Sequence, residues 1–288
     1  MNTVSYSQYT MWSNCQLAWK LKYVDGHRFD DSTINTIFGT SMHEVIQEWL
    51  DVVYNGDTSI AKKTDLDSKL VSKFHTLFKQ SIVLNEDGTK TFPCDKPTLE
   101  EFYVQGTQIL DYIKNNIDKI FPTQNEKLIG IEFPIDKEIK TGVNFVGYVD
   151  ILTYNEESGV YTIFDLKTSK SGWSDYQKKD KVKISQLLLY KKFISEHFNV
   201  PLTHVRVEYI ILKRIITENA LYKNPRVSLY EPSNGKPSVT KAWEDFSLFL
   251  NSCFDVAGQH KVDTANKSAC RFCAYRSKKE LCAYGVGE

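Results

Sequence analysis

Asp165 and Lys167 are the residues of this 288-residue chain best placed to do chemistry. They end an apolar run over 160–168 that predicts a β-strand, and residues two apart on a strand share one face. Asp150 ends a similar run one strand earlier. Two carboxylates beside an ammonium can hold a divalent cation and orient a water against a phosphate. The alternative is a salt bridge at a strand end.

His43 is a third candidate, in the segment Gly39-Thr-Ser-Met-His43. Gly39 is expected to end a loop, and Ser41-x-x-Glu44 resembles a capping box that begins a helix. His43 then borders the apolar stripe of that helix, near its N-terminus. Taken alone, a histidine in this place is more often a packed core residue than a ligand.

Polar residues on two neighbouring elements could complete the site. Gln186 and Tyr190 are four residues apart and share one face of a helix expected over 182–197. They could instead be a polar pair that caps the core. Glu132 lies in the strand expected over 127–136, where a solvated strand residue is an equally good interpretation.

Lysines and aromatic residues follow the Asp165 strand and could contact nucleic acid. Lysines neutralise phosphates, and aromatic rings stack on bases. A solvated lysine-rich loop is the alternative, because the formal net charge of the whole chain is zero. The candidate DNA-binding residues are Lys170, Trp173, Tyr176, Lys178, Lys179, Lys181 and Lys183.

Four cysteines near the two ends of the chain form a candidate metal site. The two-residue gap between Cys270 and Cys273 favours metal binding over disulfides. Structural zinc and an iron–sulfur cluster both accept four thiolates. The set is Cys15, Cys270, Cys273 and Cys282, with Cys94 and Cys253 expected as free thiols.

The elements that position these residues predict an α/β fold, with a mixed central sheet flanked by helices. We expect a single domain over 1–288. It comprises a mainly helical part (1–126), a β-rich catalytic core (127–215) and a C-terminal helix with a cysteine-rich tail (216–288). Helices are expected over 5–23, 65–78, 99–121, 182–197 and 241–254, a loop over 85–97, and strands over 127–136, 143–154, 160–168 and 205–213.

Composition excludes several classes of protein. The N-terminal residues lack the basic and apolar regions of a signal peptide, and no apolar run is long enough to cross a membrane. Because the cysteines favour metal binding over disulfides, a reducing cytoplasm fits best. The chain has no G-x-x-x-x-G-K-[ST] segment, so we expect no ATP-driven motor of its own.

In their order along the chain, these motifs resemble the RecB-like branch of the PD-(D/E)XK nuclease superfamily. The closest resemblance is to members with a cysteine-ligated iron–sulfur cluster, such as CRISPR-associated RecB-like exonucleases and AddAB-type nuclease domains. The resemblance runs from Cys15 to Cys282 and implies a restriction-endonuclease-like core. One departure is the eight-residue gap before Cys282, and another is Ala283, where the family often has proline.

The resemblance also implies roles for the candidate residues. His43, Asp150 and Asp165 would bind Mg²⁺ or Mn²⁺, and Lys167 would be the catalytic lysine. Gln186 and Tyr190 would lie over the active site. The four terminal cysteines would bind a [4Fe–4S] cluster, with structural Zn²⁺ as the alternative.

The sequence therefore predicts a metal-dependent DNA exonuclease acting on single strands or DNA ends in recombination, repair or DNA processing. Its implied partners are DNA and a helicase or recombination protein. A structure-specific endonuclease using the same site is one alternative. A non-catalytic DNA-binding or assembly module and a zinc-stabilised scaffold are two others, although neither explains Asp150, Asp165 and Lys167 together.

Overall fold

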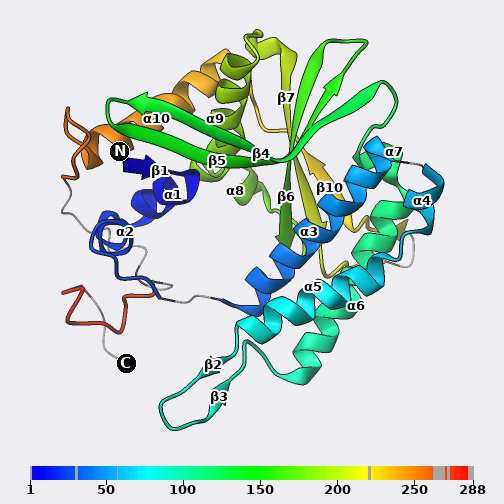
Figure 1. Ribbon diagram of the computed structural model, residues 1–288, viewed down its shortest axis with the longest axis horizontal. Coiled ribbons are helices and arrows are strands. Elements are labelled where there is room, and N and C mark those ends of the chain that lie inside the picture. Colours follow the sequence, from blue (N-terminus) through cyan, green and yellow to red (C-terminus); the bar gives the residue numbers. More distant parts are fainter. Residues whose placement is uncertain are drawn as a thin grey trace.

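A mixed β-sheet between two layers of helices forms the protein, as the computed structural model shows (Figure 1). The expected α/β class is therefore confirmed. The structure describes residues 2–29, 32–56, 58–219, 222–261, 270 and 273–284. None of the helices in these ranges is long and apolar enough to span a membrane.

The sheet has the order β1-β5-β6-β7-β10, and β4 pairs with β5. Strands β4, β5 and β6 form the expected antiparallel meander, and β6 then pairs with β7 in parallel. The strands of this sheet are β1 (Asn2–Val4), β4 (Glu126–Lys140), β5 (Val143–Asn155), β6 (Val160–Ser169), β7 (Val205–Lys213) and β10 (Val227–Tyr230). Two small hairpins lie outside it: β2 (Val83–Leu84) with β3 (Lys90–Thr91), and β8 (Glu218–Asn219) with β9 (Tyr222–Lys223).

The helices fall into two groups around the sheet. Those described are α1 (Tyr6–Asn14), α2 (Gln16–Tyr23), α3 (Ile34–Asn55), α4 (Thr58–Lys63), α5 (Leu66–Gln80), α6 (Lys96–Asn115), α7 (Ile117–Ile120), α8 (Asp175–Lys178), α9 (Lys181–His197), α10 (Lys236–Cys253) and the 3₁₀ turn η1 (Leu202–His204). Helices α1, α9 and α10 share one apolar core with the sheet, whereas α3, α5 and α6 share the other. The central strand β7 is buried on both sides, as expected for a parallel strand covered by helices.

Helix α3 differs most from its sequence-based expectation. It begins at Ile34 with Thr33 as its N-cap, so the predicted loop end at Gly39 and cap at Ser41 are wrong. Gly39 lies inside the helix, at a position where a Cβ would approach Thr168 Oγ1, at the end of β6, to 3.3 Å. The glycine therefore lets α3 pack closely on the strand that carries Asp165.

Other boundaries also shifted. The helix expected over 99–121 is two helices, α6 and α7, separated at Asn116, and the loop expected over 85–97 contains β3 and the start of α6. Strands β1 and β10 were not expected. Both are short and depend on pairing with distant strands rather than on a local pattern.

Candidate active site

A fork in the sheet creates the candidate site. Strand β6 pairs with β5 only between Ile151 and Asn155, and β1 pairs with β5 between Val143 and Phe145. Because β4 occupies the other edge of β5 along its length, β1 and β6 share the remaining edge. The stretch of β5 between them is where the two partner strands diverge.

Asp150 and Asp165 lie at this fork, each one residue beyond the last pair of the β5–β6 ladder, Ile151 with Phe164. Asp150 Oδ2 accepts a hydrogen bond of 2.7 Å from the backbone N–H of Leu166. A side chain thus satisfies a strand N–H at the point where the ladder ends. The two carboxylates meet because the strands separate there.

Asp165 is the most unusual of these groups, since its carboxylate is buried and incompletely satisfied. The residue is 1% exposed, and its Oδ1 accepts no hydrogen bond from the described residues. The Lys167 ammonium makes an ion pair with Oδ2 at 2.7 Å. Burial raises the pKa of Asp165 to about 6, although Lys167 opposes the shift. Burial would lower the pKa of Lys167, but Asp165 and Asp150 hold that pKa above its ordinary value.

His43, from the middle of α3, faces Asp150. Its Nδ1 lies 3.6 Å from Asp150 Oδ2. Burial, followed by the positive charge of Lys167, lowers the pKa of His43, so the imidazole is neutral near pH 7. Burial raises the pKa of Asp150 to about 6. A neutral imidazole and two carboxylates are suitable ligands for a divalent cation.

The residues present fit such an ion. Asp165 Oδ1 is buried without a hydrogen-bond donor among the described residues, and a bound cation would satisfy it. Among the residues with a defined position, no three His, Cys, Asp or Glu side chains already converge on one point. The Lys167 ammonium holds the place beside Asp165.

A family comparison agrees with this geometry. A model of the PD-(D/E)XK nuclease superfamily matches residues 3–278. The chain belongs to this superfamily. Its members typically use Mg²⁺ or Mn²⁺. A search of the curated proteins gives no match to the chain.

Gln47 links the helix and the strands of this nuclease fold. Its Nε2 donates to Glu132 Oε1 at 2.6 Å and to the Asp150 carbonyl oxygen at 3.2 Å. Glu132 has a positive φ of 48°, so β4 is distorted opposite Asp150. Glu132 is exposed, yet it also lies close to His43 and Asp150 and adds negative charge there. Sequence reasoning missed Gln47, although it is one helical turn after His43 on α3.

Two tyrosines, Tyr190 on α9 and Tyr6 on α1, lie near the carboxylates. Burial raises the pKa of Tyr190 to about 12, and Gln186 hydrogen-bonds to it. The charges of Asp165 and Lys167 are near enough to act on Tyr190, so α9 does bring this pair to the site. Gly147 makes room for the ring, because a Cβ there would lie 3.1 Å from Tyr190 Oη.

Tyr6 is a neighbour of the site that the sequence did not indicate. Its hydroxyl donates to the backbone carbonyl oxygens of Val182, at 2.9 Å, and Lys183, at 3.2 Å. Burial raises its pKa to about 12, and Lys167 and Asp165 act on it electrostatically. Its separation of more than a hundred residues from the carboxylates leaves no local signal.

The candidate DNA-binding residues divide into two groups. Trp173 packs on Tyr209, with ring centroids 4.8 Å apart, and Lys183 Nζ lies 4.6 Å from the Trp173 ring centre. Lys178 lies over Tyr230. These three are therefore partly engaged by the fold. The exposed members are Lys170, Tyr176, Lys179 and Lys181, with Tyr176 83% exposed.

The four terminal cysteines border one cavity, although among the described residues no three of them are close enough to hold one metal ion. The four line one small cavity of about 20 Å³ with Tyr275 and Tyr284. Cys15 separates α1 from α2, and its Sγ accepts a hydrogen bond from the Ala18 N–H at 3.4 Å. Burial raises the pKa of Cys273, and the other three thiols add to the shift. All six cysteines are free thiols.

Proposed function

We propose that the protein is a metal-dependent DNA exonuclease of the RecB-like branch of its superfamily. The observation that carries this proposal is the buried Asp165 carboxylate. Its Oδ2 pairs with the Lys167 ammonium at 2.7 Å, and its Oδ1 has no hydrogen-bond donor among the described residues. A salt bridge to Lys167 alone leaves the unsatisfied Oδ1 unexplained, whereas a bound cation would account for it.

His43, Asp150 and Asp165 would hold Mg²⁺ or Mn²⁺, which when bound supplies charge neutralisation and an acidified water. Lys167 would release Asp165 and donate to the attacking water or a phosphoryl oxygen. The water oxygen bonds to phosphorus, and the bond from phosphorus to the leaving sugar oxygen breaks. The attacking water loses one proton to solvent, and the leaving oxygen takes one from solvent.

Single-stranded DNA or DNA ends are the proposed substrates, in recombination, repair or DNA processing. The exposed lysines around α8 and the start of α9 support contacts with a phosphate backbone. A helicase or recombination protein would be the partner that supplies opened strands. An endonuclease acting through the same site is the second candidate.

The test uses linear, end-labelled and circular single strands with Mn²⁺. An exonuclease shortens the linear strand and leaves the circle intact, whereas an endonuclease cuts both. Asp165→Asn and Lys167→Ala should each abolish hydrolysis, and Asp111→Asn, an exposed carboxylate on α6, should not. Wild-type rates in either site variant would refute the active-site assignment.

We propose further that Cys15, Cys270, Cys273 and Cys282 bind one [4Fe–4S] cluster. Their arrangement around one cavity supports a four-thiolate site, and zinc is the alternative. Anaerobically purified protein should be brown and contain iron and acid-labile sulfide in equal amounts. One zinc and no iron would assign structural zinc instead, and protein with neither metal would refute a metal site.

A further inference from the structure

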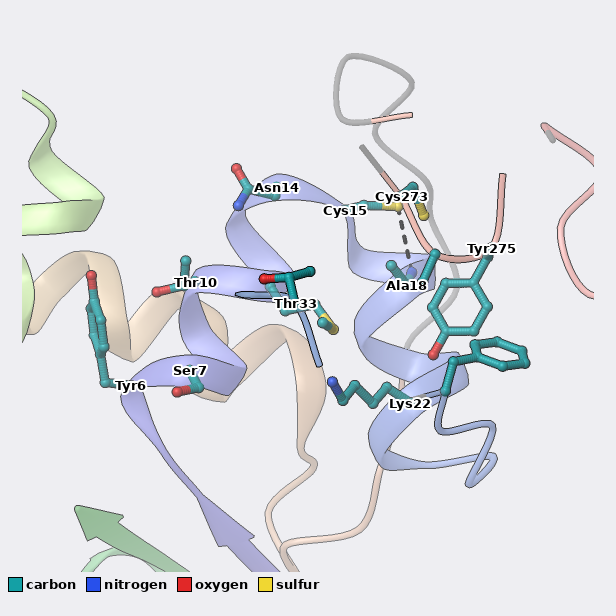
Figure 2. Close-up of a pocket in the computed structure, with 13 residues that line it drawn as sticks. Tyr6, Ser7, Thr10, Asn14, Cys15, Ala18, Lys22, Thr33, Cys273 and Tyr275 are labelled. Carbon is teal, nitrogen blue, oxygen red and sulfur yellow. Dashed lines mark hydrogen bonds between the residues drawn. The ribbon is translucent and has the colours of Figure 1, made fainter. Parts of the chain in front are cut away.

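A pocket separate from the carboxylates lies along α1 and α2. Its volume is about 810 Å³, within the range of sites that bind small molecules. Figure 2 shows side chains from both helices and from the turn around Cys273 and Tyr275 directed at this space. The proposed chemistry at Asp165 and Lys167 uses none of these side chains.

The pocket connects the two proposed sites. At one end is Tyr6, whose hydroxyl donates to the Lys183 carbonyl oxygen. The hydroxyl of Tyr209 donates to the same oxygen, and Tyr209 is paired with Asp165 between β7 and β6. At the other end are Cys15 and Cys273 of the four-cysteine cavity. Helix α1 spans the distance between the ends, and its nine residues rise by roughly 13 Å. A flexible ligand lying in the pocket would therefore extend toward the strand that carries Asp165.

The polar lining suits an anion. Ser7, Thr10 and Asn14 are spaced three and four residues apart and line one face of α1 (Figure 2). Lys22 supplies a positive charge, and the described lining contains no Asp or Glu. Phosphates would therefore meet hydroxyls, an amide and an ammonium without an opposing carboxylate.

Aromatic side chains line the same pocket. Phe29 packs edge-on against Tyr275, with ring centroids 5.4 Å apart, and Phe29 is still 37% exposed. Tyr275 is fixed because its hydroxyl donates to the His27 carbonyl oxygen at 2.6 Å. Lys278 Nζ lies 5.6 Å from the Phe29 ring centre. A partly exposed ring on a fixed support, beside cations, is suited to stacking a nucleobase.

We propose that the α1–α2 pocket binds the single DNA strand on one side of the cleaved phosphodiester, with a base on Phe29 and a phosphate on Lys22. This inference rests on the proposed nuclease function. It adds a strand-holding subsite remote from Asp165 and Lys167, between the carboxylates and the cysteines. Bases in this subsite would fix how far the strand extends beyond the point of cleavage.

The test measures binding of a fluorescent single strand by anisotropy, in full-length Asp165→Asn protein so that the strand stays intact. Phe29→Ala should weaken binding about 5- to 150-fold, the range for loss of one stacked base. Lys22→Gln should weaken binding and reduce the slope of log affinity against log salt concentration by the contribution of one phosphate contact. The matched controls are Phe92→Ala, an exposed phenylalanine outside the pocket, and Lys20→Gln, a neighbour paired with Asp25.

A series of strands with one abasic position each then identifies the stacked base. At one or two neighbouring positions of the strand, removal of the base should weaken binding to the Asp165→Asn protein. Removal of the same base should not weaken binding further when that protein also carries Phe29→Ala. Melting temperature and metal content, measured on every variant, separate this result from misfolding. Equal losses at every abasic position, or unchanged binding by both pocket variants, would overturn the subsite and assign the pocket to another ligand. Failure of the unmodified chain to hydrolyse DNA would refute the nuclease function instead.

Discussion

At the residue scale, the carboxyl groups of Asp150 and Asp165 take up protons at a higher pH than isolated aspartates do. Burial raises each pKa from 3.8 to about 6. Between these two pH values the metal-free folded chain holds more protons than the unfolded chain. The two groups therefore lower stability as the pH rises through that window. A bound cation would offset this cost by replacing the protons.

Stabilisation by Mn²⁺ should consequently depend on pH. We expect the rise in melting temperature on adding Mn²⁺ to be larger at about pH 7.5 than at about pH 5, since at the lower pH the cation must displace protons. Thermal melts with and without Mn²⁺ at both pH values measure this. Asp150→Asn should remove most of the rise. An equal rise at both pH values would contradict titration of these carboxyl groups on cation binding.

Gln47 should act on the site without contacting a substrate. Gln47→Leu removes hydrogen bonds to Glu132 and to the Asp150 carbonyl oxygen, at a cost of about 1–2 kcal/mol of unfolding free energy. Because those bonds hold the backbone at Asp150, affinity for Mn²⁺ should also fall, by roughly tenfold or more.

The control for Gln47→Leu is Gln8→Leu, a second buried glutamine with two hydrogen bonds, to Trp19 and to the Thr3 carbonyl oxygen. It should lose similar stability and keep its Mn²⁺ affinity. Chemical denaturation and Mn²⁺ titration of both variants separate the two effects. Equal Mn²⁺ affinities would show that Gln47 only stabilises the fold.

At the scale of elements, the sequence predicted the three strands of the meander, the parallel strand β7 and helix α9 with small boundary errors. Alternating or continuous apolar runs bounded by turn residues carry that information locally. It did not predict the start of α3, because Gly39 was interpreted as the end of a loop. The glycine instead allows close packing against Thr168, which is distant in sequence. The same apolar runs made it possible to identify Asp150, Asp165 and Lys167 as candidates. The positions of Tyr6 and Gln47 depend instead on packing that no local pattern encodes.

The basic segment formed by α8 and the start of α9 should set the salt dependence of DNA binding. Replacing Lys178, Lys179, Lys181 and Lys183 with Gln should reduce the slope of log affinity against log salt by up to about 3, as fewer counterions are released. The control replaces four exposed lysines on α4, α5 and β3: Lys62, Lys63, Lys79 and Lys90. An unchanged slope in the first variant would place the phosphate contacts elsewhere.

At the scale of the whole molecule, distant parts of the chain meet around α2. Tyr275 bonds to the His27 carbonyl oxygen, Asn2 Nδ2 donates to the Gly258 carbonyl oxygen, and Cys15 lies with the C-terminal cysteines. A metal bound by those thiolates would close a loop of roughly 250 residues. Closing such a loop restricts the unfolded state by an estimated 5 kcal/mol, if it acts as a disulfide of that span would.

Cys15→Ser should therefore strongly lower the melting temperature and the yield of soluble protein. In the protein that still folds, the arrangement of the carboxylates and Lys167 should be unchanged. Cys94→Ser is the matched control, because Cys94 is only partly buried and lies away from the cavity. Cys253 would be a poor control, since it is 0% exposed and a serine there would bury a hydroxyl. Equal melting temperatures for Cys15→Ser and the wild type would refute a stabilising metal at this site.

The shared edge of β5 also governs the order in which the molecule can be assembled. During synthesis β1 leaves the ribosome long before its partner residues Val143–Phe145 exist, and β6 must occupy the other half of the same edge. The fork, and with it the candidate metal site, can form only after both strands have docked on β5. Until then that edge exposes unpaired backbone groups, so we expect the incomplete chain to be prone to aggregation.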